Sequence, residues 1–273
     1  FALVPPELRN PLKTTTYGVG QLIRAVVDTE IEEIILAVGG SATVDGGIGM
    51  MQALGMTFYD RAGRVMAERV TGGDLLRIGG FSWNDPPENI ENVLFTIACD
   101  VFNPACGPLG AAAVFGPQKG ADAEGVRLLD EGLTHWAELL ENEARRSLRN
   151  EPGTGAAGGV ALPLLALANA SIVPGIDLVC EAVGLACLIP QVDLVITGEG
   201  RLDRQSLMGK VVGSVGRMAR SANVPCVAIV GTTGPGSEEC LEVLDRYATL
   251  DAPLDQTESR LADVAALLAV ELL

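Results

Sequence analysis

The stretch from Asp193 to Lys210, DLVITGEGRLDRQSLMGK, holds a dense group of side chains that could do chemistry. Its apolar beginning, Leu194 to Ile196, is typical of a buried parallel strand. We expect this strand to end at Gly198-Glu199-Gly200, because glycine lets the backbone turn sharply and lets a ligand come close. Polar and charged residues then follow within six positions, namely Arg201, Asp203, Arg204, Gln205 and Ser206.

Gly209-Lys210 opens the next helical pattern, Val211 to Ala222. In open parallel sheets, ligands bind beyond the carboxyl ends of the strands. A helix N-terminus adds free N–H groups and a positive dipole end, which favour an anion such as phosphate. The stretch therefore predicts an anion-binding site, with Gly198, Gly200 and Arg201 as binding residues.

The same order of elements occurs earlier in the chain. A strand pattern over 34–38 leads into GGSATVDGG (39–47), and a helix pattern covers 48–54. Backbone N–H groups and hydroxyls could hold an anion here, and Asp45 could hold a metal or accept a proton. The alternative is a tight turn in which Asp45 caps the helix. The predicted binding residues of this loop are Gly39, Gly40, Ser41, Thr43 and Asp45.

A third loop follows the strand pattern of Val93 to Ala98. Asp100 and Asn103 combine a carboxylate with a carboxamide, which suits a metal or a substrate hydroxyl. The alternative is an Asx-turn closed by Pro104.

Lysine is scarce in this chain. There are 16 arginines but only Lys13, Lys119 and Lys210. Lys119 and Lys210 lie in glycine-flanked stretches, and a lysine ammonium is a point charge suited to phosphate. The alternative for each is a solvated lysine in a turn.

Composition narrows the classes of function. The 273 residues carry a formal net charge of −16, which argues against nucleic acid and an anionic membrane surface as partners. The uncharged segment 152–176 is broken by glycines and prolines, so we do not expect a membrane span. Six cysteines occur without a CxxC pair, which makes a reducing cytoplasm the simplest location.

The element pattern predicts an α/β protein of two domains, residues 1–173 and 174–273. From Pro174 onward, helix and strand patterns alternate, which indicates βαβ units and a parallel sheet. Three strands are too few for a complete doubly wound domain. We therefore expect the C-terminal sheet to be incomplete, with its missing strands supplied from elsewhere.

Taken together, these loops resemble the type 1 glycerate kinase family. The resemblance runs from about residue 3 to about residue 250 and includes the upstream NPLKTTTYGVGQLI (10–23). The matching motifs are GGSATVDGG (39–47), ACDVFNP (98–104), VFGPQKGA (114–121), GAAGG (155–159), ITGEGRLD (196–203) and GK (209–210).

The resemblance implies ATP- and Mg²⁺-dependent phosphorylation of D-glycerate, giving 2-phosphoglycerate or 3-phosphoglycerate. It also implies two α/β domains, with 1–173 as an inserted domain and 174–273 as the C-terminal half of a flavodoxin-like domain. The family's initial APDSF-like and ADGGEGT-like motifs do not occur here. We therefore expect the N-terminal segment of the family to be missing from this chain.

Within this scheme we expect Lys119, Arg201 and Lys210 to contact the phosphates and the carboxylate of the acid. The predicted catalytic residues are Asp100, Asp203 and Lys210, the predicted metal ligands are Asp45 and Glu199, and Asn103 and Lys119 join the binding residues. The expected partners are D-glycerate and a nucleotide, with a homodimer left open. The alternatives are a kinase for another small hydroxy acid or sugar, a phosphatase, and an inactive ligand-binding fragment.

Overall fold

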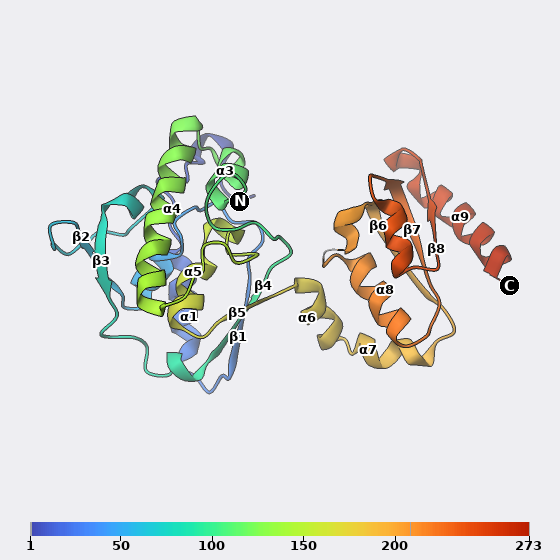
Figure 1. Ribbon diagram of the computed structural model, residues 1–273, viewed down its shortest axis with the longest axis horizontal. Helices are drawn as coiled ribbons and strands as arrows, with labels where there is room; N and C mark the ends of the chain where they lie inside the picture. The colour runs from blue at the N-terminus through green and yellow to red at the C-terminus, as the bar shows by residue number, and fades with distance from the viewer. Residues whose placement is uncertain (1, 208, 273) are drawn as a thin grey trace. The chain divides into compact units, whose positions relative to one another are not determined.

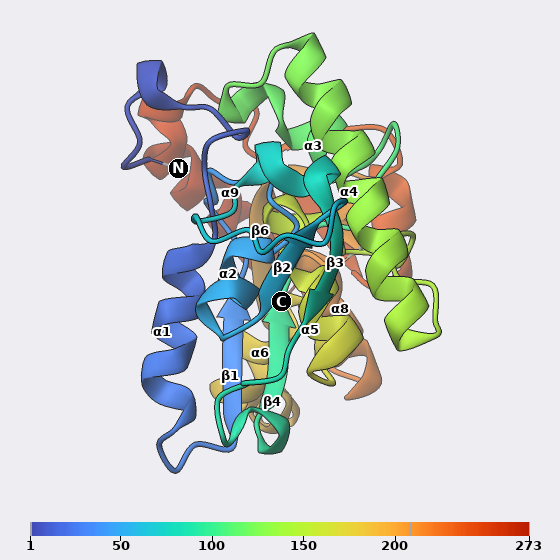
Figure 2. The same ribbon diagram turned by 90° about the vertical axis from the view of Figure 1, so that its left-hand side faces the viewer.

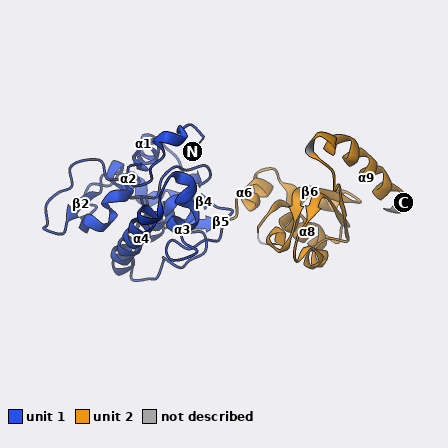
Figure 3. Cartoon of the chain, turned by 90° about the horizontal axis from the view of Figure 1, so that it is seen from above, with its two compact units in different colours: residues 1–173 blue, residues 174–273 orange. Residues whose placement is uncertain are grey.

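The computed structural model describes residues 2–207 and 209–272. The chain forms two compact units, 1–173 and 174–273 (Figure 3), which are described separately below. In the described residues, no helix is both long enough and apolar enough to cross a bilayer.

A parallel sheet carries unit 1, residues 1–173. Its strand order is β1 (Glu33–Ala37), β4 (Leu94–Ala98) and β5 (Ser171–Val173). Figure 2 shows β1 and β4 side by side and pointing the same way, with α1 beside β1. Loops after β1 and β4 therefore emerge at one edge of the sheet. The helices of the unit are α1 (Tyr17–Val27), α2 (Ile48–Ala53), α3 (Ala111–Phe115), α4 (Ala123–Ala144) and α5 (Ala161–Leu167).

Helix α4 contributes the largest buried side chain of the unit 1 core. The Asp122 carboxylate accepts a hydrogen bond from the Gly125 N–H at 2.8 Å and so caps the helix. Trp136, fully buried, packs edge-to-face on Phe58 and Phe81, with ring centroids 5.7 and 5.3 Å away. The long helix thus fixes the core beneath the loops that follow β1 and β4.

The sequence of residues 56–66, with a turn at Asp60-Arg61-Ala62-Gly63, predicts a hairpin that is only partly present. Strand β2 (Thr57–Asp60) pairs antiparallel with β3 (Ile78–Ser82), and Val65 makes just an isolated bridge to Tyr59. The sequence pattern missed β3 because its central Gly79 and Gly80 are poor strand formers. It also missed β5, which is three residues long.

Unit 2, residues 174–273, contains a second parallel sheet, shown in Figure 1. Its order is β6 (Val195–Leu202), β7 (Cys226–Thr233) and β8 (Arg246–Thr249). The core under α8 includes Ala228, whereas Ile229 packs with the core under α9, so the two helices cover opposite faces. The predicted α/β class with parallel sheets is confirmed. The helices are α6 (Gly175–Ala182), α7 (Leu185–Leu188), α8 (Val211–Ser221) and α9 (Thr257–Leu272).

The sharp turn predicted at Gly198-Glu199-Gly200 is wrong. Strand β6 runs through these residues to Leu202 and stays paired with β7. A Cβ on Gly198 would lie 2.4 Å from the carbonyl oxygen of Ile229, so this glycine permits a close approach of two strands. The chain turns only afterwards, in a 3₁₀ helix at Arg204–Leu207.

Candidate functional site

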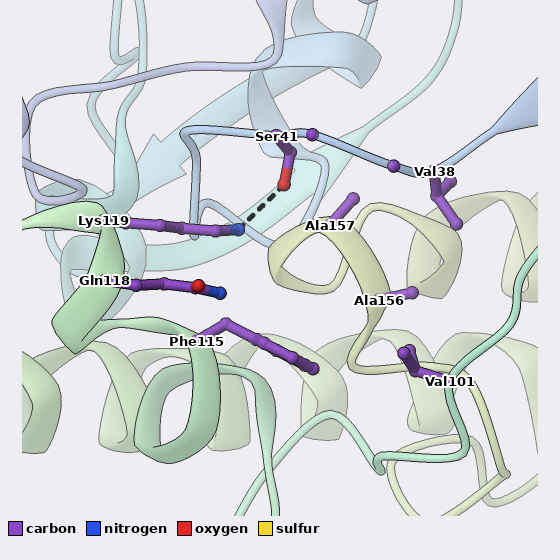
Figure 4. Close-up of a pocket in the computed structure, with 10 residues that line it drawn as sticks. Val38, Ser41, Val101, Phe115, Gln118, Lys119, Ala156 and Ala157 are labelled. Atoms are coloured by element: carbon purple, nitrogen blue, oxygen red, sulfur yellow. Dashed lines mark hydrogen bonds between the residues drawn. The ribbon is translucent and has the colours of Figure 1, made fainter. Parts of the chain in front are cut away.

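Four loops of unit 1 enclose a cavity of about 300 Å³ (Figure 4). Two of these loops follow the parallel strands β1 and β4, at the sheet edge where ligands bind in such folds. The other two precede and follow α4. The lining residues are Val38, Gly39, Gly40, Ser41, Val101, Phe115, Gln118, Lys119, Ala156 and Ala157.

The cavity contains a buried lysine. Lys119 is 4% exposed, and its Nζ donates to Ser41 Oγ at 2.8 Å and to the Thr43 carbonyl at 2.7 Å. Burial lowers the pKa of Lys119 from its usual 10.5 to about 8, and the charge of Asp45 acts in the opposite direction. An ammonium has three donors, so one remains for a ligand in the cavity.

Asp45 anchors the loop that carries Ser41 and Thr43. Its fully buried carboxylate accepts from the Thr16 N–H (2.7 Å), the Thr16 hydroxyl (2.8 Å), and the Gly47 and Gly49 N–H groups (3.2 and 3.3 Å). Burial raises the pKa of Asp45, and these hydrogen bonds oppose that rise. The geometry favours Asp45 as a helix cap over a metal ligand. Its carboxylate accepts from N–H groups at the start of α2 and does not line the cavity.

Tertiary contacts hold the same loop from its other side. The Trp136 indole N–H donates to the Gly46 carbonyl at 2.8 Å, and the Gly46 N–H donates to the Gly158 carbonyl at 2.9 Å. Gly158 has a φ of +76°, and a Cβ there would lie 2.2 Å from the Thr43 carbonyl oxygen. Only glycine fits where these two loops touch.

Asp100 and Asn103 border the cavity without lining it. Asp100 is exposed and directly precedes the lining residue Val101. The Asn103 side-chain amide donates to the Leu109 carbonyl at 2.8 Å, so it braces its own loop. Asp100 is therefore the carboxylate nearest in sequence to the cavity wall.

The predicted residues of unit 2 form a separate charged cluster. One Asp203 oxygen lies 3.7 Å from Arg201 Nε and the other lies 4.0 Å from Lys210 Nζ. Lys210 directly precedes α8. The Ser206 hydroxyl donates to the Glu199 carboxylate and accepts from the Asp203 backbone N–H, which ties Glu199 to the backbone of the loop that begins at Asp203. This cluster offers cations and carboxylates together, at the end of β6 and in the loop that joins β6 to α8.

The part of each unit that the structure describes contains no complete metal site. Among the described residues, no group of three or more His, Cys, Asp or Glu side chains could hold a metal ion. Mg²⁺ often binds through one or two carboxylates together with substrate phosphates. Glu199 in β6 and Asp203 just after it could meet that smaller requirement, because the Ser206 hydroxyl bonds both the Glu199 carboxylate and the Asp203 backbone N–H.

The structure thus divides the predicted residues between two places. Gly39, Gly40, Ser41 and Lys119 line the unit 1 cavity, and Thr43 accepts from Lys119 at its edge. Sequence reasoning assigned no role to the remaining lining residues, although several lie in the glycine-rich motifs around 114–121 and 155–159. Those residues are Val38, Val101, Phe115, Gln118, Ala156 and Ala157.

The fold is that of an α/β protein with parallel sheets, and its buried lysine and its cation–carboxylate cluster are residue types suited to anions. The Glycerate kinase family profile matches residues 1–271. The glycerate kinase of Halalkalibacterium halodurans is 41% identical over 98% of this chain and 72% of its own length. That of Haemophilus influenzae is 45% identical over 84% of this chain and 60% of its own.

A solved structure gives the same result. A crystal structure assigned provisionally to glycerate kinase 2 of Salmonella typhimurium LT2 superposes with a TM-score of 0.78 and 37% identity, covering 99% of this chain and 73% of that one. The chain therefore belongs to the glycerate kinase family. It spans between 60% and 73% of the length of these relatives.

Proposed function

We propose that this chain phosphorylates D-glycerate with ATP and Mg²⁺. The observation that carries the proposal is the pairing of a buried lysine in a small cavity with a separate cation–carboxylate cluster, in a chain of the glycerate kinase family. The Escherichia coli relative, 37% identical over 91% of this chain, is named glycerate 2-kinase. That name favours the 2-hydroxyl as acceptor, with 3-phosphoglycerate as the alternative product.

The reaction needs positioned charges more than covalent chemistry. The acceptor hydroxyl oxygen forms a bond to the γ-phosphorus, the bond to the β,γ-bridging oxygen breaks, ADP leaves, and a carboxylate takes the hydroxyl proton. Asp100 beside the unit 1 cavity and Asp203 in the unit 2 cluster are the candidates for that carboxylate. Arg201 and Lys210 are suited to the phosphate oxygens.

Glu199, together with Asp203, would hold Mg²⁺ beside the phosphates. The ion would neutralise phosphate charge when bound.

We further propose that 174–273 is the C-terminal half of a flavodoxin-like domain in which 1–173 is inserted. Strand β6 lies at the edge of its three-stranded sheet, and its apolar residue Ile196 is 62% exposed. Both observations support an incomplete sheet. The cysteine pattern supports a cytoplasmic location.

The test is a coupled assay of ADP formation by the 273-residue chain, with ³¹P NMR to identify the phosphorylated hydroxyl. We expect ADP formation to require D-glycerate and to stop when EDTA removes divalent ions. Glycerol, which lacks the carboxylate, serves as the control acceptor. Binding of D-glycerate and ATP without turnover would support the alternative of an inactive ligand-binding chain, and turnover with another hydroxy acid or sugar alone would identify a different kinase.

A further inference from the structure

The cavity of unit 1 and the cluster of unit 2 differ in the charge they can accept. Among the described residues that line the cavity, Lys119 is the only charged one. The Asp45 carboxylate, which accepts a hydrogen bond from the Gly47 N–H, partly offsets the positive charge of Lys119. A triphosphate placed here would bury several negative charges against one ammonium, which is costly. A single negative charge matches the cavity.

The remaining lining groups suit a short carbon chain with hydroxyls. Val38, Val101 and Phe115 supply apolar wall, whereas the Ser41 hydroxyl and the Gln118 amide supply hydrogen-bonding groups. Figure 4 shows Gln118 and Lys119 extending side by side into the cavity, with Ala156 and Ala157 opposite. A volume of about 300 Å³ is at the lower end of the range for small-molecule sites.

We propose that Lys119 Nζ binds the carboxylate of the acceptor acid and takes no part in binding the nucleotide. The proposal rests on the proposed function, since it allocates that reaction's two ligands between two parts of the chain. A small monoanionic hydroxy acid fills the unit 1 cavity, with its carboxylate on the one free donor of Lys119 and its hydroxyls toward Gln118 and Ser41. The phosphates of the nucleotide belong to the Arg201–Asp203–Lys210 cluster.

The loops hold Lys119 in place before any ligand arrives. Its two hydrogen bonds to Ser41 and Thr43 fix the ammonium, and the contact of Gly158 with Thr43 fixes that loop in turn. A preorganised charge of this kind loses little entropy on binding. Removal of the charge should therefore cost acid affinity without loosening the nucleotide site.

Calorimetry of the 273-residue chain with D-glycerate, in the absence of nucleotide, tests the proposal. We expect Lys119→Met to weaken D-glycerate binding about 10- to 100-fold, the range for a hydrogen bond to a charged group. A fluorescent ATP analogue should bind this variant with unchanged affinity. Lys13→Met is the matched control, because Lys13 is an exposed lysine of the same unit and should change neither affinity.

The methyl ester of D-glycerate gives a second measurement, because acid and ester can be compared on the wild-type chain alone. The wild-type chain should bind the ester as weakly as Lys119→Met binds the acid, and the variant should lose nothing further with the ester. Equal affinity of the wild type for acid and ester, or a loss of nucleotide affinity in Lys119→Met, would overturn the proposal.

The two proposals can fail separately. Acid binding that depends on Lys119 in a chain without turnover would leave this inference standing and remove the proposed function. Turnover with an unchanged KM for D-glycerate in Lys119→Met would support the proposed function and overturn this inference.

Discussion

The candidate residues of unit 1 and unit 2 differ in how their positive charges are exposed to solvent. In unit 1 a single lysine is 4% exposed and held by two hydrogen bonds, in a cavity with otherwise neutral walls. In unit 2 the side chains of Arg201 and Lys210 are 61% and 42% exposed around Asp203. A buried lone charge selects a ligand by its size and net charge, whereas exposed charges attract polyanions with little shape selection.

The comparison predicts that the stability of unit 1 depends on close packing between the loops around its cavity. Gly158→Ala places a methyl group against the Thr43 carbonyl at a φ of +76°, so we expect a loss of about 3 kcal/mol in the free energy of unfolding. Urea unfolding followed by tryptophan fluorescence measures this, because Trp83 and Trp136 both lie in unit 1.

Gly63→Ala is the matched control for this prediction. Gly63 has a φ of +77° but open space around it, so only the backbone strain of about 1 kcal/mol should remain. Equal losses in the two variants would show that contact between the loops does not matter.

Asp45 distinguishes a structural carboxylate from a metal ligand. Asp45→Ala leaves buried N–H donors of Thr16, Gly47 and Gly49 without an acceptor, which should lower the free energy of unfolding by about 2–3 kcal/mol. The same urea experiment measures the loss. If EDTA destabilised the wild-type chain but did not affect Asp45→Ala, the result would support Asp45 as a metal ligand.

Asp203 tests the exposed cluster. Asp203→Ala should reduce turnover by about 10²-fold or more, whether it positions phosphates or accepts a proton. D-glycerate affinity, measured by calorimetry, should stay unchanged if the acid binds in unit 1. Glu242→Ala removes another exposed carboxylate of unit 2 and should leave turnover intact. Wild-type turnover in Asp203→Ala would exclude that residue from the reaction.

The pKa of Lys119 predicts the most gradual effect, which is only twofold near pH 8. Since acid binding requires the ammonium, D-glycerate affinity should be half lost near pH 8 and then fall about tenfold per pH unit. Calorimetry across pH 7 to about 10 measures this, with nucleotide affinity as the comparison. Because the unfolded chain keeps its Lys119 proton up to about pH 10.5, burial of this charge costs stability below pH 8, and the cost declines as the pH rises between the two values. A flat pH profile of acid binding would contradict the role of the ammonium.

Sequence patterns located most of these groups because glycine, lysine and acidic residues stand out against apolar strands. They could not show that β6 continues through Gly198 and Gly200, because strand pairing with β7 overrides the local turn preference of glycine. Nor could they find the apolar wall of the cavity. Val101 and Ala157 resemble core residues until the fold places them around Lys119.

The sequence by itself determined the parallel α/β class, which follows from periodicity, and the residue types available for anion binding, and its glycine-rich motifs indicated the family by their resemblance to it. Only the tertiary structure decided that Lys119 is buried, that Asp45 is consumed by hydrogen bonds, and that four loops separated by up to about 120 residues share one cavity. Burial and hydrogen bonding depend on segments far apart in the chain, and they make a lysine that the sequence places in a turn into a buried, hydrogen-bonded ammonium.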